Sequence, residues 1–412
     1  MATTYLTPGI YVEEVPSGPR PIEAVGTRTA GFVGEAPAAK RRVNEIVAIN
    51  NWTEFLRNFS EESSASTPLS HAVYGFFQNE GSRCYVVNVG PGGNVAGGGR
   101  RREGLQLLET IDEIAIVAAP GYTDPASYDA LLTHCETLKD RVAILDPPEE
   151  IESIVSLTQV ATAASPRRAS SGGDEEAVST AAPAGGLRPR QSDAGFGAFY
   201  FPRITVRDPL PPGELVDVAP SGHIAGIWAR SDARRGVHKV PANETVRGAL
   251  NVSYNVTREE QGELNPAGVN VIRFFSVEGT RVWGARTLAD SASEWRYLNV
   301  RRLFNMIEES IEESTRWIVF EPNDETLWRS IRRDVGAFLT RLWRDGALMG
   351  STPQEAFFVQ CDHETNPPDV IDAGMVITRI GIAPVKPAEF IVFRISQFAG
   401  GAEVEIEGGA RA

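Results

Sequence analysis

Short apolar runs alternate with helical patterns between residues 29 and 146, and this alternation restricts the fold more than any other feature of the chain. Four runs consist mainly of small and β-branched apolar residues: TAGFVG (29–34), CYVVNVG (84–90), EIAIVAAPG (113–121) and RVAILD (141–146). Apolar residues recur at helical spacing in the segments between them: WTEFLRNFS (52–60), PLSHAVYGFFQNEG (68–81) and SYDALLTHCETLKD (127–140). Apolar strands separated by helices are typical of a parallel sheet covered on both faces. The sequence therefore predicts an α/β fold with a largely parallel mixed sheet.

The composition changes abruptly at residues 163–194, which are rich in Ser, Gly, Pro, Ala and charged residues. Such a segment has almost nothing to bury. We interpret it as a flexible surface insertion, with an interdomain linker as the alternative. The insertion is favoured because FGAFYFPRITVRDP (196–209) resumes with strand character, as though the same sheet continued.

The last third of the chain predicts two helices followed by strands. The first helix begins near Leu298 and leads into an expected strand over 317–320, and the second has Asn323 or Asp324 as its N-cap and stops at Gly346. Arg329, Arg333 and Arg344 fall on one side of the second helix, opposite its apolar stripe. They form either a solvated face or a docking surface for an acidic partner. Two alternating segments, GMVITRIGIAP (374–384) and EFIVFRISQ (389–397), predict strands.

An isolated strand near the start of the chain has no obvious hydrogen-bond partner. The segment PGIYVEEVPSG (8–18) contains strand-forming residues from Ile10 to Val15, but proline and glycine precede and follow them. No hairpin partner can follow directly. The strand therefore has unpaired edges that another chain can satisfy by strand addition.

Composition and charge exclude several classes of protein. A length of 412 residues allows two or three domains. The net charge of −14 argues against a nucleic-acid-binding or anionic-membrane-binding protein. No apolar run is long enough for a membrane span and the start lacks signal-peptide features, so we expect synthesis in the cytoplasm. The three cysteines are far apart and predict buried thiols rather than disulfides or a zinc site.

Searching for catalytic or ligand-binding residues yields no convincing set. Ser221 and His223 lie close in sequence, but the pattern that places a serine nucleophile on a sharp turn is absent. The segment CDHET (361–365) collects potential metal ligands without a second cluster nearby. The glycine-rich segment 90–100 lacks the spacing of a phosphate-binding loop. We therefore expect no catalytic residues, no metal and no cofactor.

Several blocks in a fixed order resemble the sheath proteins of contractile injection systems, a family that includes contractile phage tails, R-type pyocins and extracellular phage-tail-like particles. The resemblance covers nearly the whole chain outside 163–194, and its details are most similar to the extracellular particles. The blocks are YLTPGIYVEEVPSGPRPIEAVGTRTAGFVG, PLSHAVYGFFQNEGSRCYVVNVG, APGYTDPASYDALLTHCE, NPAGVNVIRFFSVEGTRVWGARTL, EWRYLNVRRLFNMIEESIEESTRWIVFEPND and DVIDAGMVITRIGIAPVKPAEFIVFRISQ.

The resemblance implies a structural subunit, with six copies in a ring around an inner tube, rings stacked helically, and contraction that drives the tube through a target envelope. Terminal strands exchanged between neighbouring subunits would complete the sheet of the C-terminal domain. The positions that carry over are Ile10, Tyr11, Val12, Glu13, Glu14 and Val15 at the N-terminus and Phe390, Ile391, Val392, Phe393, Arg394 and Ile395 near the C-terminus. By placement and charge, Arg329, Arg333 and Arg344 are the candidates for inner-tube contact.

The resemblance also implies a division of the chain and a set of partners. We expect an N-terminal arm (1–25), an outer α/β domain (26–285) and an inner sheath domain (286–412) that ends in a C-terminal arm from about 385. The expected partners are other copies of the chain, the inner tube, and baseplate and terminal cap proteins, without nucleic acid or membrane insertion. Assembly is expected in the cytoplasm, with release of the particle left open. The alternatives are a subtilisin-like hydrolase, suggested by the topology ascribed to the family's central domain, and a monomeric adhesion or scaffold module.

Overall fold

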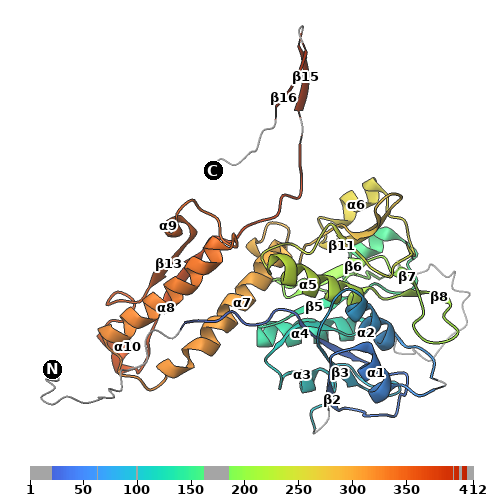
Figure 1. The fold of residues 1–412 in the computed structure, drawn as a ribbon, viewed down its shortest axis with the longest axis horizontal. Helices are drawn as coiled ribbons and strands as arrows, with labels where there is room; N and C mark the ends of the chain where they lie inside the picture. Colours follow the sequence, from blue (N-terminus) through green and yellow to red (C-terminus); the bar gives the residue numbers. More distant parts are fainter. Residues whose placement is uncertain are drawn as a thin grey trace, which may run out of the picture. The chain divides into compact units, whose positions relative to one another are not determined.

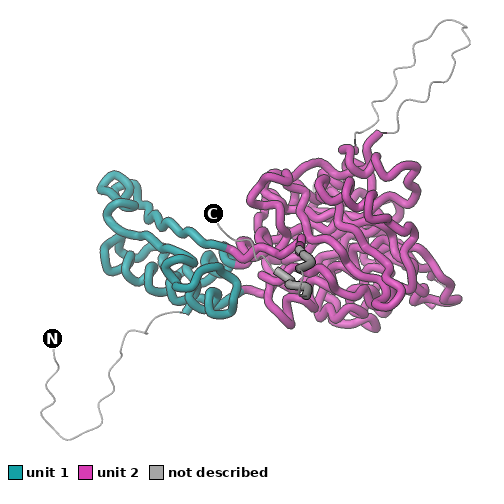
Figure 2. Tube along the Cα trace, turned by 90° about the horizontal axis from the view of Figure 1, so that it is seen from above, with its two compact units in different colours: residues 1–24, 307–383 teal, residues 25–306, 384–412 magenta. Residues whose placement is uncertain are grey.

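A computed structural model describes residues 21–62, 64–98, 101–161, 185–392, 394–398 and 401–405. The chain divides into two compact units (Figure 2). The larger unit comprises residues 25–306 and 384–412, and the smaller comprises 1–24 and 307–383. Because of this division, the chain passes between the units at three places, 24/25, 306/307 and 383/384. The predicted strand Ile10–Val15 and Phe393 lie outside the described residues.

A mixed sheet of nine strands, counted over the described residues, forms the centre of the larger unit (Figure 1). Its order is β2 (Ile46–Ile49), β3 (Cys84–Asn88), β1 (Thr29–Gly34), β4 (Ile114–Ala118), β5 (Val142–Leu145), β6 (Gly197–Phe201), β11 (Val269–Phe275), β12 (Gly279–Val282) and β9 (Glu244–Thr245). The pairings from β3 through β11 are parallel, whereas β2, β12 and β9 pair antiparallel. The prediction of a largely parallel mixed sheet is confirmed.

Helices cover both faces of this sheet. Those of the larger unit are α1 (Trp52–Phe59), α2 (Pro68–Gln78), α3 (Leu105–Leu108), α4 (Pro125–Leu138), α5 (Ser221–Arg235) and α6 (Arg258–Leu264), with 3-10 turns at Ile154–Thr158 and Glu294–Arg296. A second, smaller sheet has the order β10 (Asn251–Val252), β7 (Ile204–Arg207) and β8 (Leu215–Val218). Successive side chains of β1 belong to different hydrophobic clusters on the two faces of the sheet. Phe32 lies in the cluster that contains residues of α1, α2 and α5, and Val33 lies in the cluster that contains residues of α3 and α4. The strands are apolar throughout because both of their faces are buried.

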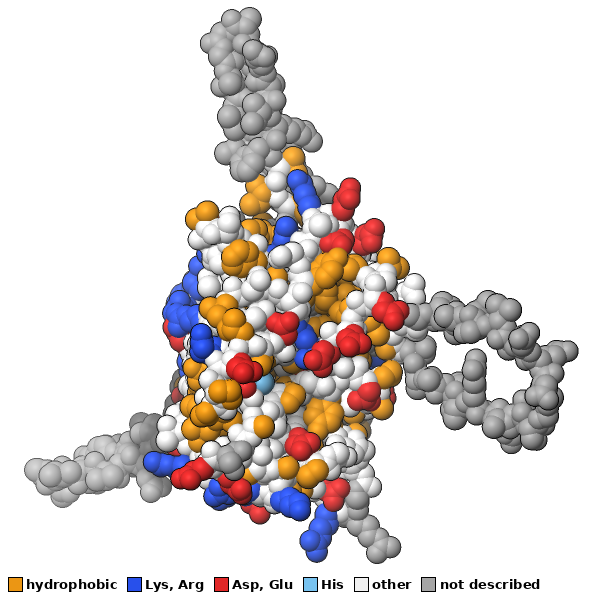
Figure 3. Space-filling view, turned by 90° about the vertical axis from the view of Figure 1, so that its right-hand side faces the viewer, with side chains coloured by type: hydrophobic (Ala, Val, Ile, Leu, Met, Phe, Trp, Pro, Cys, Tyr) orange, Lys and Arg blue, Asp and Glu red, His pale blue; other side chains and the backbone are white. Residues whose placement is uncertain are grey.

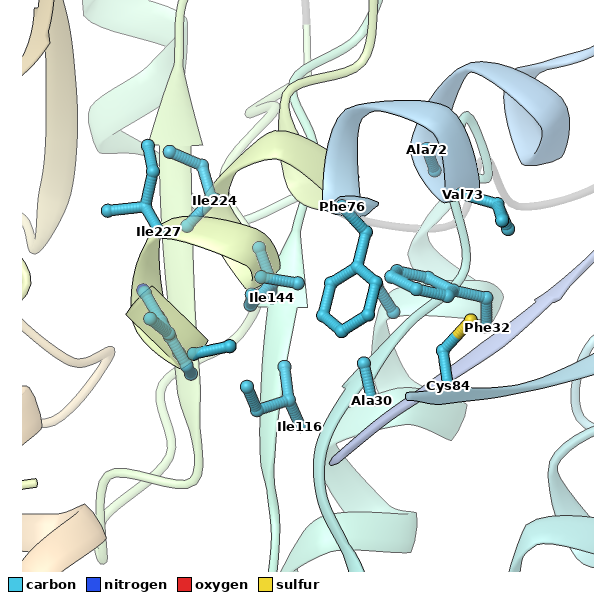
Figure 4. Packing of buried hydrophobic residues seen from close by; sticks show 14 of the residues in the cluster. Ala30, Phe32, Ala72, Val73, Phe76, Cys84, Ile116, Ile144, Ile224 and Ile227 are labelled. Atoms are coloured by element: carbon cyan, nitrogen blue, oxygen red, sulfur yellow. The ribbon is translucent and has the colours of Figure 1, made fainter. Parts of the chain in front are cut away.

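The core on the α2–α5 side is packed without space for additional atoms between the two helices (Figure 4). A Cβ atom added to Gly222 of α5 would lie 2.2 Å from the Cα of Ala72 in α2. One added to Gly226 would lie 2.5 Å from the carbonyl oxygen of Phe76. Ile224 and Ile227 of α5 lie in the same cluster as Phe32 and Phe76. Glycine at these two positions therefore allows the helix backbones to come into contact.

The smaller unit contains most of the helical C-terminal part of the chain. Its elements are the second half of α7 (Leu298–Thr315), a 3-10 turn at Arg316–Ile318, α8 (Glu325–Arg344), α9 (Pro353–Ala356), β13 (Phe357–Gln360), α10 (Pro368–Asp372) and β14 (Arg379–Ile382). Asp324 caps α8 by accepting a hydrogen bond from the Leu327 amide, and Gly346, at φ 79°, follows its last turn. The predicted N-cap and stop of this helix are confirmed.

Two sequence-based expectations are wrong. The strand expected over 317–320 is a 3-10 turn, Arg316–Ile318, followed by exposed Val319 and Phe320, and no strand of the described residues pairs with this segment. Residues 185–194 of the expected flexible insertion are packed against the domain. Arg190 pairs with Asp129 and Glu136 of α4, and Ser192 is buried. The other residues of that segment, 163–184, lie outside the described part of the chain.

The strand predicted over 389–397 begins later than expected. It starts at Arg394 as β15 (Arg394–Phe398) and pairs antiparallel with β16 (Gly401–Glu405). Residues 389–392 precede it without strand pairing. Alternation in the sequence indicates which residues can form a strand, but its limits depend on where a partner strand lies.

Buried titratable groups make the stability of the larger unit depend on pH. Burial, together with nearby Arg141, lowers the pKa of His134 to about 4, and burial beside His71 lowers that of His223 to about 3. Both histidines are therefore neutral in the folded chain at pH values where the unfolded chain binds protons, so acidification below pH 6.5 destabilises the fold. Burial also raises the pKa of Asp146 to about 6. As the pH falls, Asp146 is therefore protonated in the folded chain before it is protonated in the unfolded chain. This protonation stabilises the fold and offsets part of the stability lost through the histidines.

We predict that His134→Gln makes the larger unit less sensitive to acid. Between pH 6.5 and about pH 4.5 each neutral buried histidine costs about 1.4 kcal/mol of stability per pH unit. The variant should therefore lose about 2 to 3 kcal/mol less than the parent chain over this interval. Urea unfolding followed by circular dichroism at several pH values measures the difference. Equal losses for the two proteins would contradict the prediction.

Candidate functional sites: two anchored arms and an open sheet

The base of the N-terminal arm, at Ile22 and Glu23, is held by α7 and α8 of the smaller unit. Ile22 is buried, and its carbonyl oxygen accepts a hydrogen bond from Arg341 of α8. The backbone N–H of Glu23 donates to the hydroxyl of Ser314 on α7 over 3.3 Å. These contacts fix the path of the chain just after residue 20.

A buried ion pair in the larger unit holds the chain four residues later. Arg302 of α7 makes two hydrogen bonds to the carboxylate of Asp232 on α5, at 2.7 and 3.0 Å. The Thr27 hydroxyl donates to the same carboxylate over 2.6 Å, and Arg302 donates to the Thr27 carbonyl over 2.9 Å. The guanidinium also lies 4.7 Å from the centre of the Trp228 ring. Only 3% of the Arg302 side chain and 2% of Asp232 are exposed, so the pair is shielded from water and salt.

The C-terminal arm is held in a similar way at Glu389. Arg286 donates to both carboxylate oxygens, from Nε at 2.9 Å and from Nη2 at 2.7 Å. Asn265 and Tyr297 donate to the same carboxylate over 3.2 and 3.3 Å. Partial burial by itself would raise the pKa of Glu389, but these hydrogen bonds and the charge of Arg286 outweigh it and lower the pKa. The C-terminal arm is therefore fixed to the rest of the larger unit at Glu389.

The residues directly after this anchor are apolar and exposed. Phe390, Ile391 and Val392 expose 74%, 72% and 66% of their surface. Large apolar side chains in an unbroken exposed run are uncommon in a protein that works alone. Three of the six predicted exchange positions of this arm therefore lie free of the chain's own core, and Arg394 and Ile395 lie in β15.

The smaller unit contains a sheet with open edges. β13 and β14 pair antiparallel from Phe357↔Ile382 to Gln360↔Arg379, and among the described residues they pair with no other strand. Figure 1 shows β13 beside α8. Unpaired strand edges carry rows of free backbone N–H and C=O groups, and these are templates for strands of another chain. A two-stranded sheet is also marginally stable by itself, so added strands would stabilise it.

The three arginines proposed for contact with the inner tube lie on the exposed side of α8. Arg329, Arg333 and Arg344 are exposed, and Arg333 contacts only the neighbouring Asp334 among the ion pairs found in the described residues. By contrast, Arg332 and Arg341 donate to the Cys361 and Ile22 carbonyls. Arg341 is exposed as well, so what distinguishes Arg332 and Arg341 is their hydrogen bonds to backbone carbonyls of other segments.

The structure does not bring Ser221 and His223 together as a catalytic pair. The Ser221 hydroxyl donates to Asp146 over 2.7 Å. The imidazole of His223 is buried against Gly75 of α2, and neither of its nitrogens has a hydrogen-bond partner in the described part of the chain. His223 is therefore not positioned as a base for Ser221, and the hydrogen bond from the buried Ser221 hydroxyl to Asp146 holds the start of α5 at the end of β5.

The segment 361–365 forms a turn held by its own polar groups. The Asp362 carboxylate accepts from the amides of Glu364 and Thr365, and Cys361 is buried with its sulfur 3.7 Å from the Asn366 amide nitrogen. No group of three or more metal-ligating side chains occurs within the described ranges.

One face of the molecule shows how charged and apolar side chains are distributed on the surface. On the face in Figure 3, carboxylates are scattered among apolar and basic side chains, and the basic side chains do not form one continuous patch. Across the residues that the structure describes, no helix is both long and apolar enough to span a membrane.

Comparisons with known proteins agree with these features. The phage tail sheath protein central domain matches residues 110–288, and the phage tail sheath C-terminal domain matches residues 290–398. A chain in the cryo-EM structure of the anti-feeding prophage baseplate is 31% identical, with a TM-score of 0.72 over 96% of this chain and 100% of that one. The chain belongs to the contractile tail sheath family.

Other sheath proteins are similar over different lengths. A chain of the contracted sheath complex of an extracellular contractile injection system, PVC, is 30% identical, with a TM-score of 0.75 over 97% of this sheath chain and 99% of that one. The tail sheath protein of Vibrio phage KVP40 is 29% identical over 174 residues, which are 42% of this chain but 25% of the phage protein. The chain therefore aligns with only a quarter of that longer relative.

The family domains and the compact units divide the sheath chain differently. The two family domains meet near residue 289, whereas the larger unit extends to residue 306 and includes residues after 383. The reason lies in α7, where Asn299 donates to the carbonyls of His238 and Val385 and Arg302 holds Thr27. These contacts join the start of the C-terminal family domain to the larger unit.

Sequence reasoning missed both arm anchors. Arg302 lies about 200° around the helix from Val300, and this position predicts a solvated side chain. Its partner is 70 residues away, and the partner of Glu389 is 103 residues away. The only available signal was the paired Arg301-Arg302 at the apolar start of a helix.

We predict that removing one charge of the buried pair destabilises the sheath subunit strongly. Asp232→Asn should lower the free energy of unfolding by about 3 to 5 kcal/mol, because the Arg302 guanidinium is left buried without a countercharge. Arg234→Ala is the control, since it removes an exposed pair with Glu80 and should cost at most about 1 kcal/mol. Denaturant unfolding of both variants measures the effect. Equal losses of unfolding free energy in the two variants would show that the buried pair contributes no more to stability than the exposed pair does.

Proposed function

We propose that this chain is the repeating subunit of a contractile sheath. Six copies form a ring around an inner tube, rings stack helically, and a change from a long to a short sheath drives the tube through a target envelope. The observation that carries the proposal is the β13–β14 sheet, which pairs with no further strand among the described residues, in a chain whose two arms are each anchored at the base. Similar chains in a six-fold baseplate and a contracted sheath support it. Ser221 and His223 are both buried, and in the described part of the chain they do not form a hydrogen-bonded pair. No observation therefore favours the hydrolase alternative, and we propose a role without catalysis.

Strand exchange is the means by which we propose that subunits are joined. The segment Gly9–Val15 of one copy and Glu389–Gln397 of another would add to the β13–β14 sheet of a third. The distance from Val15 to the anchored Ile22 is seven residues, which can span about 24 Å when extended. Donation from copy to copy along the axis is heterologous and does not close on itself, so it produces a tube rather than a dimer.

Contraction can use a modest difference between two arrangements of the subunits. Exchanged arms keep neighbours connected while the bodies rotate into new contacts. A difference of a few kcal/mol per subunit is typical of two-state switches, and it accumulates over many copies. The anchors at Thr27 and Glu389 would carry the load from the arms into the larger unit.

The partners that we propose are other copies of this chain, the inner tube, and the baseplate and terminal cap proteins of the particle. We propose that the exposed arginines of α8 contact the inner tube. Synthesis and assembly would take place in the cytoplasm, followed by release as part of a phage-tail-like particle.

Deleting residues 1–20 tests the role of the N-terminal arm. The truncated chain should fold, since it keeps the buried Ile22 and its contacts with α7 and α8, but it should no longer form long tubes in negative-stain microscopy. Deletion of residues 406–412 is the control, because it shortens the other terminus beyond β16. Tubes of normal length from the first deletion would refute the arm exchange. A single small species from the intact chain at high concentration would favour a monomeric scaffold module instead.

Replacing Arg329, Arg333 and Arg344 with glutamate tests the inner-tube surface. The exposed positions should tolerate the change, so circular dichroism and sheath–sheath association should be preserved. Assembly on isolated inner tubes, measured by co-sedimentation, should be lost because the charge of the surface is reversed.

The matched control places the same change in charge elsewhere. Arg101, Arg102 and Arg207 are exposed on the larger unit, and their replacement by glutamate alters the net charge equally. This variant should bind tubes as the parent does. Equal loss in both variants would indicate a general charge effect and would contradict a specific docking surface on α8.

A further inference from the structure

The C-terminal arm ends in a hairpin rather than in a single strand. β15 and β16 are antiparallel, with partners from Arg394↔Glu405 to Phe398↔Gly401 (Figure 1). Phe398 and Gly401 are partners in this register, so two residues connect the strands. Five consecutive residue pairs therefore join β15 to β16 of the same chain.

This pairing leaves β15 with one free edge. A strand has two rows of backbone N–H and C=O groups, and β16 takes one of them. Among the described residues, no strand other than β16 pairs with β15. A strand of another chain can therefore reach β15 only from the side away from β16.

We propose that the C-terminal arm is donated to a second copy of this chain as the intact β15–β16 hairpin. β15 pairs through its free edge with the β13–β14 sheet of that copy, and β16 becomes the outer edge and prevents further strands from adding. This inference rests on the proposed strand exchange and specifies which element is exchanged. It differs from donation of a single strand because the hairpin does not have to open.

The composition of the two strands supports these different roles. Two of the five residues of β16 are glutamates, Glu403 and Glu405. Charged residues on an edge strand resist addition of further strands. The segment that leads into β15 is instead the exposed apolar run from Phe390 to Val392, which favours association.

The anchor at Glu389 limits where the hairpin can bind. Arg394 is the fifth residue after Glu389, so β15 begins within about 17 Å of the backbone of the anchored Glu389. An isolated hairpin is marginally stable in water, whereas a sheet of three or more strands is not. Docking on β13–β14 would therefore stabilise both two-stranded elements.

A disulfide across the hairpin tests whether it is donated intact. Gln397 and Ala402 are cross-strand partners in the register, and Gln397→Cys with Ala402→Cys allows β15 and β16 to be linked. The natural cysteines Cys84, Cys135 and Cys361 are all buried, so oxidation should act on the new pair. Tube formation is compared between the oxidised and reduced forms of this one variant. Equal tube yield supports donation of the hairpin, and loss of tubes on oxidation alone would overturn it.

Two truncations separate this inference from the strand exchange on which it rests. A stop after Val392 removes both strands and should abolish tubes, and tubes from this chain would overturn C-terminal exchange itself. A stop after Phe398 removes only β16 and should still give tubes, which should now associate into bundles because the outer edge is uncovered. Separate tubes like those of the full chain would overturn the capping role of β16. Loss of tubes would overturn the assignment of β15 as the joining strand.

Discussion

The buried contacts of Asn299 and Arg302 hold the chain close to the points where it passes between its two units. Arg302 fixes Thr27 through Asp232, and Asn299 fixes Val385, so the first turns of α7 join segments from both ends of the sequence. Breaking a buried ion pair is costly because it leaves a charge without water or countercharge. In the sheath that we propose, these contacts would hold the bases of the arms to the larger unit and so transmit force between subunits.

The second constraint is the set of strand edges that stay unpaired among the described residues. The nine-stranded sheet ends in short or antiparallel strands, and helices cover both its faces. The β13–β14 sheet has no such protection among the described residues, and the apolar residues Phe390, Ile391 and Val392 are exposed. Such edges and side chains are a liability in a monomer. They become useful when identical chains supply the missing strands, so the exposed elements are better explained by assembly than by the isolated chain.

Much of the fold could be predicted from the sequence because its strands are buried on both faces. The apolar runs at 29–34, 84–90, 113–121 and 141–146 allow only one kind of environment, and the helix signals at Asp324 and Gly346 are local. The prediction of a strand over 317–320 was wrong because the composition of a segment does not show whether a partner strand lies beside it. The anchors were missed because Arg302 and Glu389 find partners 70 and 103 residues away. The family was recognised from several blocks in order, whereas the residues that hold the arms required the structure.

The two anchors also differ in how they respond to solvent. Arg302–Asp232 is almost completely buried, whereas Glu389 is partly exposed and accepts hydrogen bonds from Arg286, Asn265 and Tyr297. Hydrogen bonds from Arg286 lower the pKa of Glu389, so its attachment weakens only when strong acid protonates the carboxylate. Salt screens a partly exposed pair more than a buried one. The C-terminal attachment is therefore the more adjustable of the two, and it lies directly before the exposed apolar segment that we propose to join a neighbouring subunit.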